Sequence, residues 1–185
     1  MLETERLVLR PPTVEDADAL EPVFGDAEVM RFVAAGRPLA RPELEALVAR
    51  MVERFATDGF GQFVVQRRAD GHVVGRVGLL PLDPQTWEAG TAVALGARAE
   101  LEIGWTLARA EWGHGYAFEA ASAVRAFAAE TLGRSRLVSI VQNGNDRSVR
   151  LVERLGGRPE RRIVTSFGKQ ATVYGYTLGP VASGE

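Results

Sequence analysis

The stretch 110–117, which reads AEWGHGYA, carries the clearest chemical signal in the sequence. It follows a segment with strand alternation and opens an alanine-rich segment of helical character. Gly113 and Gly115 lack side chains, so backbone N–H groups there can converge on an anion. The first turn of the helix adds unpaired N–H groups and the positive end of the helix dipole. We therefore expect a pyrophosphate-binding loop that needs neither a lysine nor a metal ion.

The two glycines leave alternatives open. A Gly-x-Gly pair before a helix also occurs in ordinary tight turns. A Rossmann dinucleotide site is disfavoured, because Phe118 stands where the third glycine belongs and no acidic residue follows near position 135. A nucleotide-binding domain of another fold is disfavoured for the same missing glycine and for the absence of a phosphate-loop lysine.

Two glutamates upstream of this loop lie on one face of an expected strand. Residues 100–107 alternate, with Leu101, Ile103, Trp105 and Leu107 on one face and Glu100, Glu102 and Thr106 on the other. A carboxylate on such a face can take part in proton transfer. A solvent-facing strand glutamate fits the same pattern, so both interpretations stay open.

The missing residue types exclude several chemistries. The chain has no cysteine, which excludes disulfides, thiolate metal ligands and cysteine nucleophiles. Its two histidines, His72 and His114, are too far apart for a zinc motif, and Lys169 is the only lysine. The net charge of −2 gives no general attraction for nucleic acid. No membrane-spanning run or N-terminal leader is visible, so we expect a cytoplasmic protein.

The remaining elements follow hydrophobic periodicity and turn residues. The segment 82–98 looks irregular, and Asn145 is expected to cap a helix that ends near Leu155. Further strands are expected at 5–10, 62–67, 73–80, 136–142, 160–166 and 171–178, and further helices at 13–24, 42–57 and 117–132. This order predicts one α/β domain over residues 1–185, with a mixed, mostly antiparallel sheet of six to seven strands and about four flanking helices.

Four segments resemble the GNAT superfamily of N-acetyltransferases. The segment WGHGYAFEAA resembles the family's acyl-CoA pyrophosphate loop, Gln/Arg-x-x-Gly-x-Gly/Ala; Gly113 and Gly115 match, while Ala110 replaces the Gln/Arg. The opening TERLVLRPPTVEDADAL…DAEVMRFV and the strand LEIGW resemble the RimJ/RimL-like branch. The segment NGNDRSVRLVERLGG resembles its Asn-x-x-Ser helix, with Gly157 in place of an aromatic residue. The resemblance spans nearly the whole chain in the family's order.

The resemblance implies acetyl-CoA as cosubstrate, no metal, and a role for each matching residue. Glu102 would be the general base, with Glu100 as substitute, and Ser148 would donate to the departing thiolate, with Tyr174 or Tyr176 as substitutes. The residues implied in acetyl-CoA binding are Trp105, Thr106 and Leu107 through backbone N–H groups, the loop residues Gly113, His114, Gly115, Tyr116 and Ala117, and Asn145.

The acceptor amine is not legible in the sequence. The branch favours a protein N-terminal α-amine, while polyamines, amino-sugar antibiotics and amino-acid-like metabolites are alternatives. A CoA-binding module without turnover is a further alternative. Trp87 either lines an acceptor pocket or packs in the fold or at a dimer interface. We expect no nucleic-acid or membrane partner, and either a monomer or a homodimer.

Overall fold

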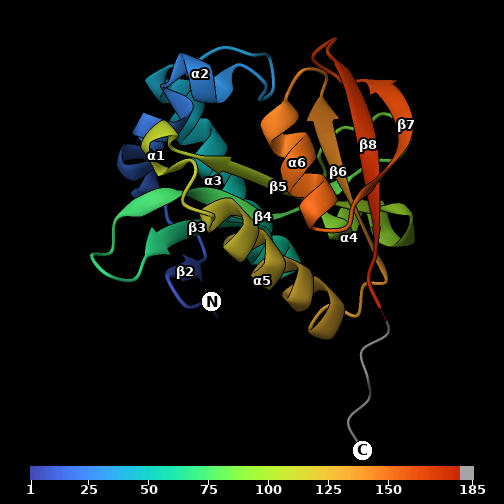
Figure 1. The fold of residues 1–185 in the computed structure, drawn as a ribbon, viewed down its shortest axis with the longest axis horizontal. Helices are drawn as coiled ribbons and strands as arrows, with labels where there is room; N and C mark the ends of the chain where they lie inside the picture. The colour runs from blue at the N-terminus through green and yellow to red at the C-terminus, as the bar shows by residue number, and fades with distance from the viewer. Residues whose placement is uncertain (180–185) are drawn as a thin grey trace, which may run out of the picture.

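A single mixed sheet forms the centre of the molecule (Figure 1). The computed structural model describes residues 1–179. The strand order is β1-β2-β3-β4-β5-β6-β8-β7, and all neighbours pair antiparallel except β5 and β6. The strands are β1 Leu2–Glu3, β2 Leu7–Arg10, β3 Gln62–Arg67, β4 Val73–Leu82, β5 Glu100–Leu107, β6 Arg136–Gln142, β7 Arg158–Val164 and β8 Gln170–Thr177. The predicted mixed, mostly antiparallel α/β fold is confirmed.

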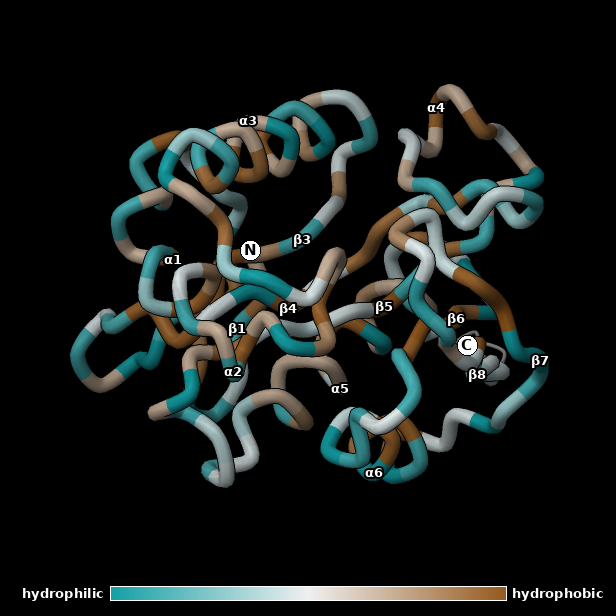
Figure 2. The backbone as a smooth tube through the Cα atoms, turned by 90° about the horizontal axis from the view of Figure 1, so that it is seen from above, coloured by the Kyte–Doolittle hydropathy of each residue, from teal (hydrophilic) through white to brown (hydrophobic). Residues whose placement is uncertain are grey.

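Helices cover both faces of the sheet (Figure 2). The helices are α1 Asp16–Phe24, α2 Ala27–Met30, α3 Arg41–Asp58, α4 Ala92–Leu95, α5 Tyr116–Glu130 and α6 Asp146–Arg154, with 3-10 turns η1 Gly96–Arg98 and η2 Arg109–Glu111. No helix within residues 1–179 is long and apolar enough to cross a bilayer.

The two faces of the sheet pack against two different cores. On one face Ile103 packs with Ala120 and Val124 of α5, and the same core takes in Val152 of α6. On the other face Val64 of β3 packs among residues of α1, α2 and α3. The alternation of β5 therefore separates an α5–α6 side from an α1–α3 side, and Glu102 lies on the latter.

The sheet is nearly interrupted between β5 and β6. Only one register pair, Glu102 with Val138, joins these two parallel strands. Next to it the Ser139 hydroxyl donates to the Ile103 carbonyl at 2.7 Å, which replaces a backbone bond by a side-chain bond. Beyond this point the two strands separate, and the backbone of β5 has a free edge.

The structure corrects the expected elements in the N-terminal third. β1 and α2 were not expected; α2 is only four residues long, and Asp26 caps it by accepting from Glu28 N and Val29 N. The first helix begins at Asp16 rather than Thr13, with a turn at 14–15 before it. The Asp16 carboxylate accepts from the Thr13 N–H, as in a capping box that begins at Thr13.

The segment 82–98, expected to be irregular, contains α4 and η1. Thr91 caps α4 by accepting from Ala94 N at 3.2 Å. Asp58, at the end of α3, accepts from Ala92 N at 2.8 Å and from Val93 N at 3.2 Å. This short helix was missed because a residue 34 positions away satisfies its first N–H groups.

Candidate active site

The glycine loop adopts the backbone that its sequence suggested. Gly113 and Gly115 have φ angles of +82° and +81°, a region that L side chains rarely adopt, and Gly115 is the N-cap of α5. A Cβ on Gly113 would meet nothing within 4 Å. The glycines are therefore needed for backbone conformation, and the space above Gly113 is open to a ligand.

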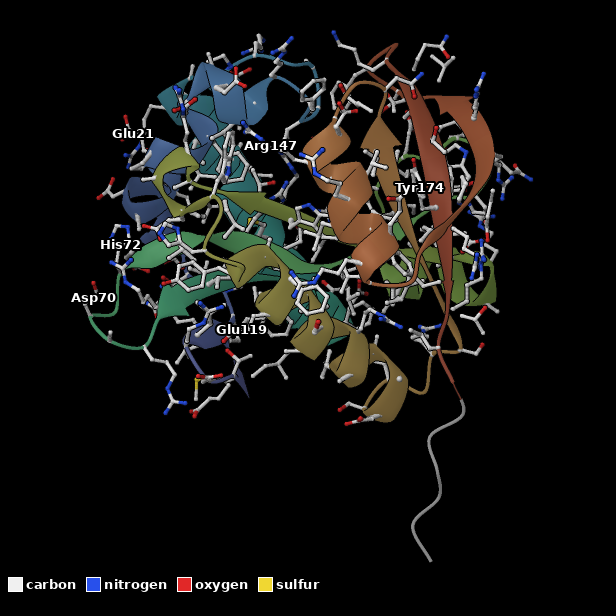
Figure 3. All side chains as sticks on the ribbon, in the orientation of Figure 1. Glu21, Asp70, His72, Glu119, Arg147 and Tyr174 are labelled. Atoms are coloured by element: carbon white, nitrogen blue, oxygen red, sulfur yellow. The ribbon has the colours of Figure 1, made fainter. Side chains whose placement is uncertain are left out.

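The N-terminal segment holds this loop from behind. Arg6 donates to the His114 carbonyl at 2.9 Å and to Glu119 at 2.7 Å, and its guanidinium lies 4.8 Å from the Tyr116 ring centroid. Burial alone would raise the pKa of Glu119, but the hydrogen bonds from Thr4 and Arg6 outweigh it, so the pKa is lowered. Glu119 is labelled at the start of α5 in Figure 3. Sequence reasoning missed this support, although Thr4 and Arg6 belong to the opening TERL.

A cavity of about 910 Å³ lies between the loop, the end of β5 and α6. Most of the residues expected to bind acetyl-CoA line it together with Ser148: Trp105, Thr106, Leu107, Gly113, Gly115, Tyr116, Ala117 and Asn145. His114 is not among the lining residues; its ring stacks on Tyr116 with centroids 5.6 Å apart.

Three arginines of α6 line the same cavity and were not expected. Arg147, Arg150 and Arg154 are spaced three and four residues apart, so they share one face of the helix. Arg147, labelled in Figure 3, lies 4.3 Å from the Trp112 ring centroid, and Arg154 lies 3.8 Å from that of Phe118. Within residues 1–179 none of the three forms an ion pair, so the cavity wall has positive charge available for phosphates.

A hydrogen bond connects β5 and α6 across the cavity. Trp105 Nε1 donates to Ser148 Oγ at 3.3 Å, and Asn145 caps α6 by accepting from Ser148 N at 3.3 Å. The Ser148 hydroxyl keeps its own hydrogen for another acceptor. Asn145 is thus the N-cap of α6, as its residue type predicted, and it also lines the cavity.

Strand alternation decides which backbone groups of β5 face the free edge. Ala108 N–H reaches Val74 O of β4 at 2.9 Å. Because N–H groups alternate sides along a strand, Thr106 N–H also points toward β4, while those of Trp105 and Leu107 point away from it. Two of the three expected N–H donors therefore lie on the edge that separates from β6.

Glu102 lies on the α1–α3 side, beside the opening between the strands. Its carboxylate accepts from Ile140 N at 3.4 Å. Burial raises the pKa of Glu102 to about 7, against the opposing effects of the Ile140 hydrogen bond and the Arg76 charge. A group with this pKa can both gain and lose a proton near neutral pH. Glu100, in contrast, pairs with Arg136 at 3.2 Å.

A second cavity, of about 410 Å³, lies on the α1–α3 side of the sheet. Its lining comes from the ends of α1 and α2, the segment 33–39, α3, Arg76 of β4 and Phe167 between β7 and β8. Glycine at position 104 leaves room beside Glu102 on this face: the nearest atom to an added Cβ would be Glu102 Cδ, at 3.9 Å.

Several candidate residues lie outside these cavities. The Tyr176 hydroxyl is hydrogen-bonded to Ser139 at 2.9 Å, and burial raises its pKa to about 12, so it is a poor proton donor. Trp87 packs under the Arg161 guanidinium, 5.0 Å from it, and lines neither cavity. Figure 3 shows His72 on the β3–β4 hairpin, across the molecule from Tyr174 on β8.

Packing explains why glycine replaces the aromatic residue of the family pattern at position 157. An added Cβ there would lie 2.5 Å from Val152 Cγ1 and 2.7 Å from Tyr176 Cε1. The Tyr176 ring already fills the space beside this position, so a side chain at 157 cannot be accommodated without movement of the core.

Comparison with known proteins identifies the family. The family described as Acetyltransferase (GNAT) domain matches residues 6–158. YoaA of Bacillus subtilis, an uncharacterised N-acetyltransferase, is 26% identical over 174 residues, 94% of this chain and 92% of its own length. An acetyltransferase structure from Agrobacterium tumefaciens is 30% identical, with a TM-score of 0.76 over 96% of this chain and 94% of that one.

RimL, a ribosomal L7/L12 α-N-protein acetyltransferase solved in complex with coenzyme A, shares the fold. Its TM-score is 0.74 at 14% identity, over 95% of this chain and 96% of its own. The GNAT fold uses acetyl-CoA, and the family match covers most of the present chain. The order of elements, the glycine loop and these matches agree: the chain belongs to the GNAT family of N-acetyltransferases.

Proposed function

We propose that the whole chain acts as one catalytic domain that transfers the acetyl group of acetyl-CoA to a primary amine by direct attack. The observation that carries this proposal is Glu102: a carboxylate with a pKa near 7, placed where β5 and β6 separate. A CoA-binding module without turnover would have no need for a destabilised carboxylate at that point.

The lining of the larger cavity suits acetyl-CoA. Backbone N–H groups at Gly113 and Gly115, with the α5 N-terminus, would bind the pyrophosphate, and the arginine face of α6 supplies additional positive charge. The free edge of β5 would bind the acyl arm, with an N–H of Trp105 or Leu107 donating to the thioester oxygen.

The amine would enter from the α1–α3 side. Glu102 takes its proton, directly or through one water, and the neutral nitrogen attacks the thioester carbon. The N–C bond forms and the C–S bond breaks. The Ser148 hydroxyl gives its proton to the departing sulfur and regains one from the nitrogen, which loses its second proton as the amide forms. The products are the acetylated amine and CoA.

The acceptor has two candidate forms. The structural likeness to RimL suggests a protein N-terminal α-amine, but at 14% identity it supports the fold alone. The second cavity, at about 410 Å³, suits a small amine, and we favour that form because the cavity shares the Glu102 side of the sheet.

The decisive experiment measures thiol release from acetyl-CoA with a panel of primary amines. Amine-dependent release together with an acetylated product by mass spectrometry is the expected result. Tight acetyl-CoA binding with no amine-dependent release would refute the enzyme and favour the binding module.

A further inference from the structure

The smaller cavity has an excess of positive charge. Its ionisable lining residues are Arg37, Glu43, Arg50 and Arg76. Arg37 and Glu43 pair with each other at 2.5 Å, which leaves two arginines. Within residues 1–179 neither Arg50 nor Arg76 forms an ion pair, although this chain pairs many of its other arginines.

Arg76 is held in place by uncharged partners. The Gln62 side-chain oxygen accepts from its guanidinium, which also lies 5.0 Å from the Phe24 ring centroid. Burial lowers the pKa of Arg76 to about 10, so the group is still charged at neutral pH. The Glu102 charge acts on Arg76, but within residues 1–179 the two groups form neither an ion pair nor a hydrogen bond. The half-buried guanidinium therefore has no anion in contact with it, and such a charge is unfavourable until one binds.

Other cations surround the same space. Arg54, one turn after Arg50 on α3, lies close enough for its charge to act on Arg76. At the rim, the Lys169 ammonium lies 3.6 Å from where a Cβ on Gly36 would be, next to the lining residues 34 and 35. The cavity is therefore positive at its inner wall and at its rim.

Glu102 lies on the same face of the sheet as this cavity but is not one of its lining residues. Leu80 faces Glu102 in the β4–β5 register, and Arg76 lies four residues before Leu80. At roughly 3.3 Å per residue, about 13 Å of strand separates the two positions. The long side chains of Arg76 and Glu102 shorten this distance, since their charges act on each other. A small acceptor that bridges the two side chains would place its amine at Glu102 and a second group, several bonds away, at the arginines.

We infer, on the basis of the proposed function, that the acceptor is a small amine that also carries a carboxylate, bound by Arg50 and Arg76 while its amine faces Glu102. A carboxylate supplies the anion that this pair of guanidinium groups lacks. Polyamines and amino-sugars would bring further positive charge to a positive wall and are disfavoured.

The test uses matched acceptors that differ only in this charge. 4-Aminobutyrate and glycylglycine are compared with their carboxamides, alongside spermidine and a tetrapeptide with an acidic second residue. We expect kcat/KM for the free acids to exceed that for the amides by about tenfold or more. Equal values for acid and amide, a preference for spermidine, or turnover of the peptide alone would overturn the inference while leaving the proposed function intact.

Arg50→Ala tests the residue directly, because Arg50 is exposed and its loss should not disturb the fold. We expect Arg50→Ala to raise KM for the free acid about tenfold and to leave KM for the carboxamide unchanged. Arg158→Ala, which removes an exposed arginine of β7 that lines neither cavity, is the matched control and should change neither. An equal effect of Arg50→Ala on acid and amide would contradict the assignment.

Calorimetry separates two outcomes: a protein that catalyses no transfer, and a protein whose smaller cavity does not bind a carboxylate. If no amine is turned over, 4-aminobutyrate is titrated into the CoA-bound protein. Binding that Arg50→Ala weakens supports the anion site even without catalysis, and no measurable binding of the acid overturns it.

Discussion

Replacing Glu102 with glutamine should lower activity and raise stability at the same time. With a pKa of about 7, roughly half of Glu102 is carboxylate at pH 7 and about a tenth at pH 6. General-base assistance is typically worth about 10²–10⁴-fold. Glu102→Gln should therefore reduce kcat/KM by about that factor at pH 7–8. The deficit should shrink at higher pH, where more of the amine is already neutral.

The stability effect has the opposite sign. The folded-state pKa of Glu102 lies above its ordinary value of 4.5, so the folded protein holds this proton more tightly than the unfolded chain does. The wild type therefore loses stability as pH rises from 4.5 through 7, by at most about 3 kcal/mol. Glutamine carries no charge to desolvate, so Glu102→Gln should unfold at higher denaturant concentration at pH 8 and at about the same concentration at pH 4.

Two measurements check this prediction, with Glu100→Gln as the control. Turnover is followed by thiol release between pH 6 and 9, and stability by denaturant unfolding at pH 4 and 8. Glu100 is engaged by Arg136, so its replacement should preserve turnover. Near-wild-type turnover of Glu102→Gln across the pH range would refute its role as base. An unchanged stability at pH 8 would refute the desolvation argument.

Three further outcomes are expected. Acetyl-CoA should raise the melting temperature without added metal, by the equivalent of about 2.7 kcal/mol at 100 times Kd; an unchanged melt at millimolar acetyl-CoA would count against the site. Gly113→Asp should weaken CoA binding far more than Gly113→Ala, which carries the same backbone strain at φ +82° without the charge; calorimetry that finds equal affinities would place the phosphates elsewhere. Ser148→Ala should slow acetyl transfer about tenfold with little change in CoA affinity, and single-turnover kinetics at the wild-type rate would remove Ser148 from the mechanism.

Local signals predicted the elements closest to the chemistry. β5 and β6 begin and end where the alternation predicted, and Asn145 caps α6 as its residue type indicated. The glycine pair of the 110–117 loop lies at the start of a helix, as predicted, and the structure adds that both glycines have positive φ angles. In each case the deciding residues lie within the element itself.

What depends on distant residues could not be predicted. Glu100 and Glu102 share one face of β5, so alternation cannot separate them. The separation comes from Arg136 of β6, which engages Glu100, and from burial, which raises the pKa of Glu102. The arginine pair of the smaller cavity is likewise assembled from α3 and β4. The spacing of Arg147, Arg150 and Arg154 places them on one face of α6, but only the fold shows that this face lines the larger cavity.

The single register pair between β5 and β6 has a mechanical consequence. The sheet consists of two halves, β1–β5 and β6–β8, with little backbone bonding to keep them in line. On the α5–α6 face Arg125 of α5 donates to the Leu155 carbonyl at 2.6 Å and lies 5.7 Å from the Tyr176 ring centroid. Cooperative unfolding of the whole chain therefore depends on side-chain contacts of this kind and on the core that the two halves share, so weakening those contacts should let one half of the sheet unfold before the other.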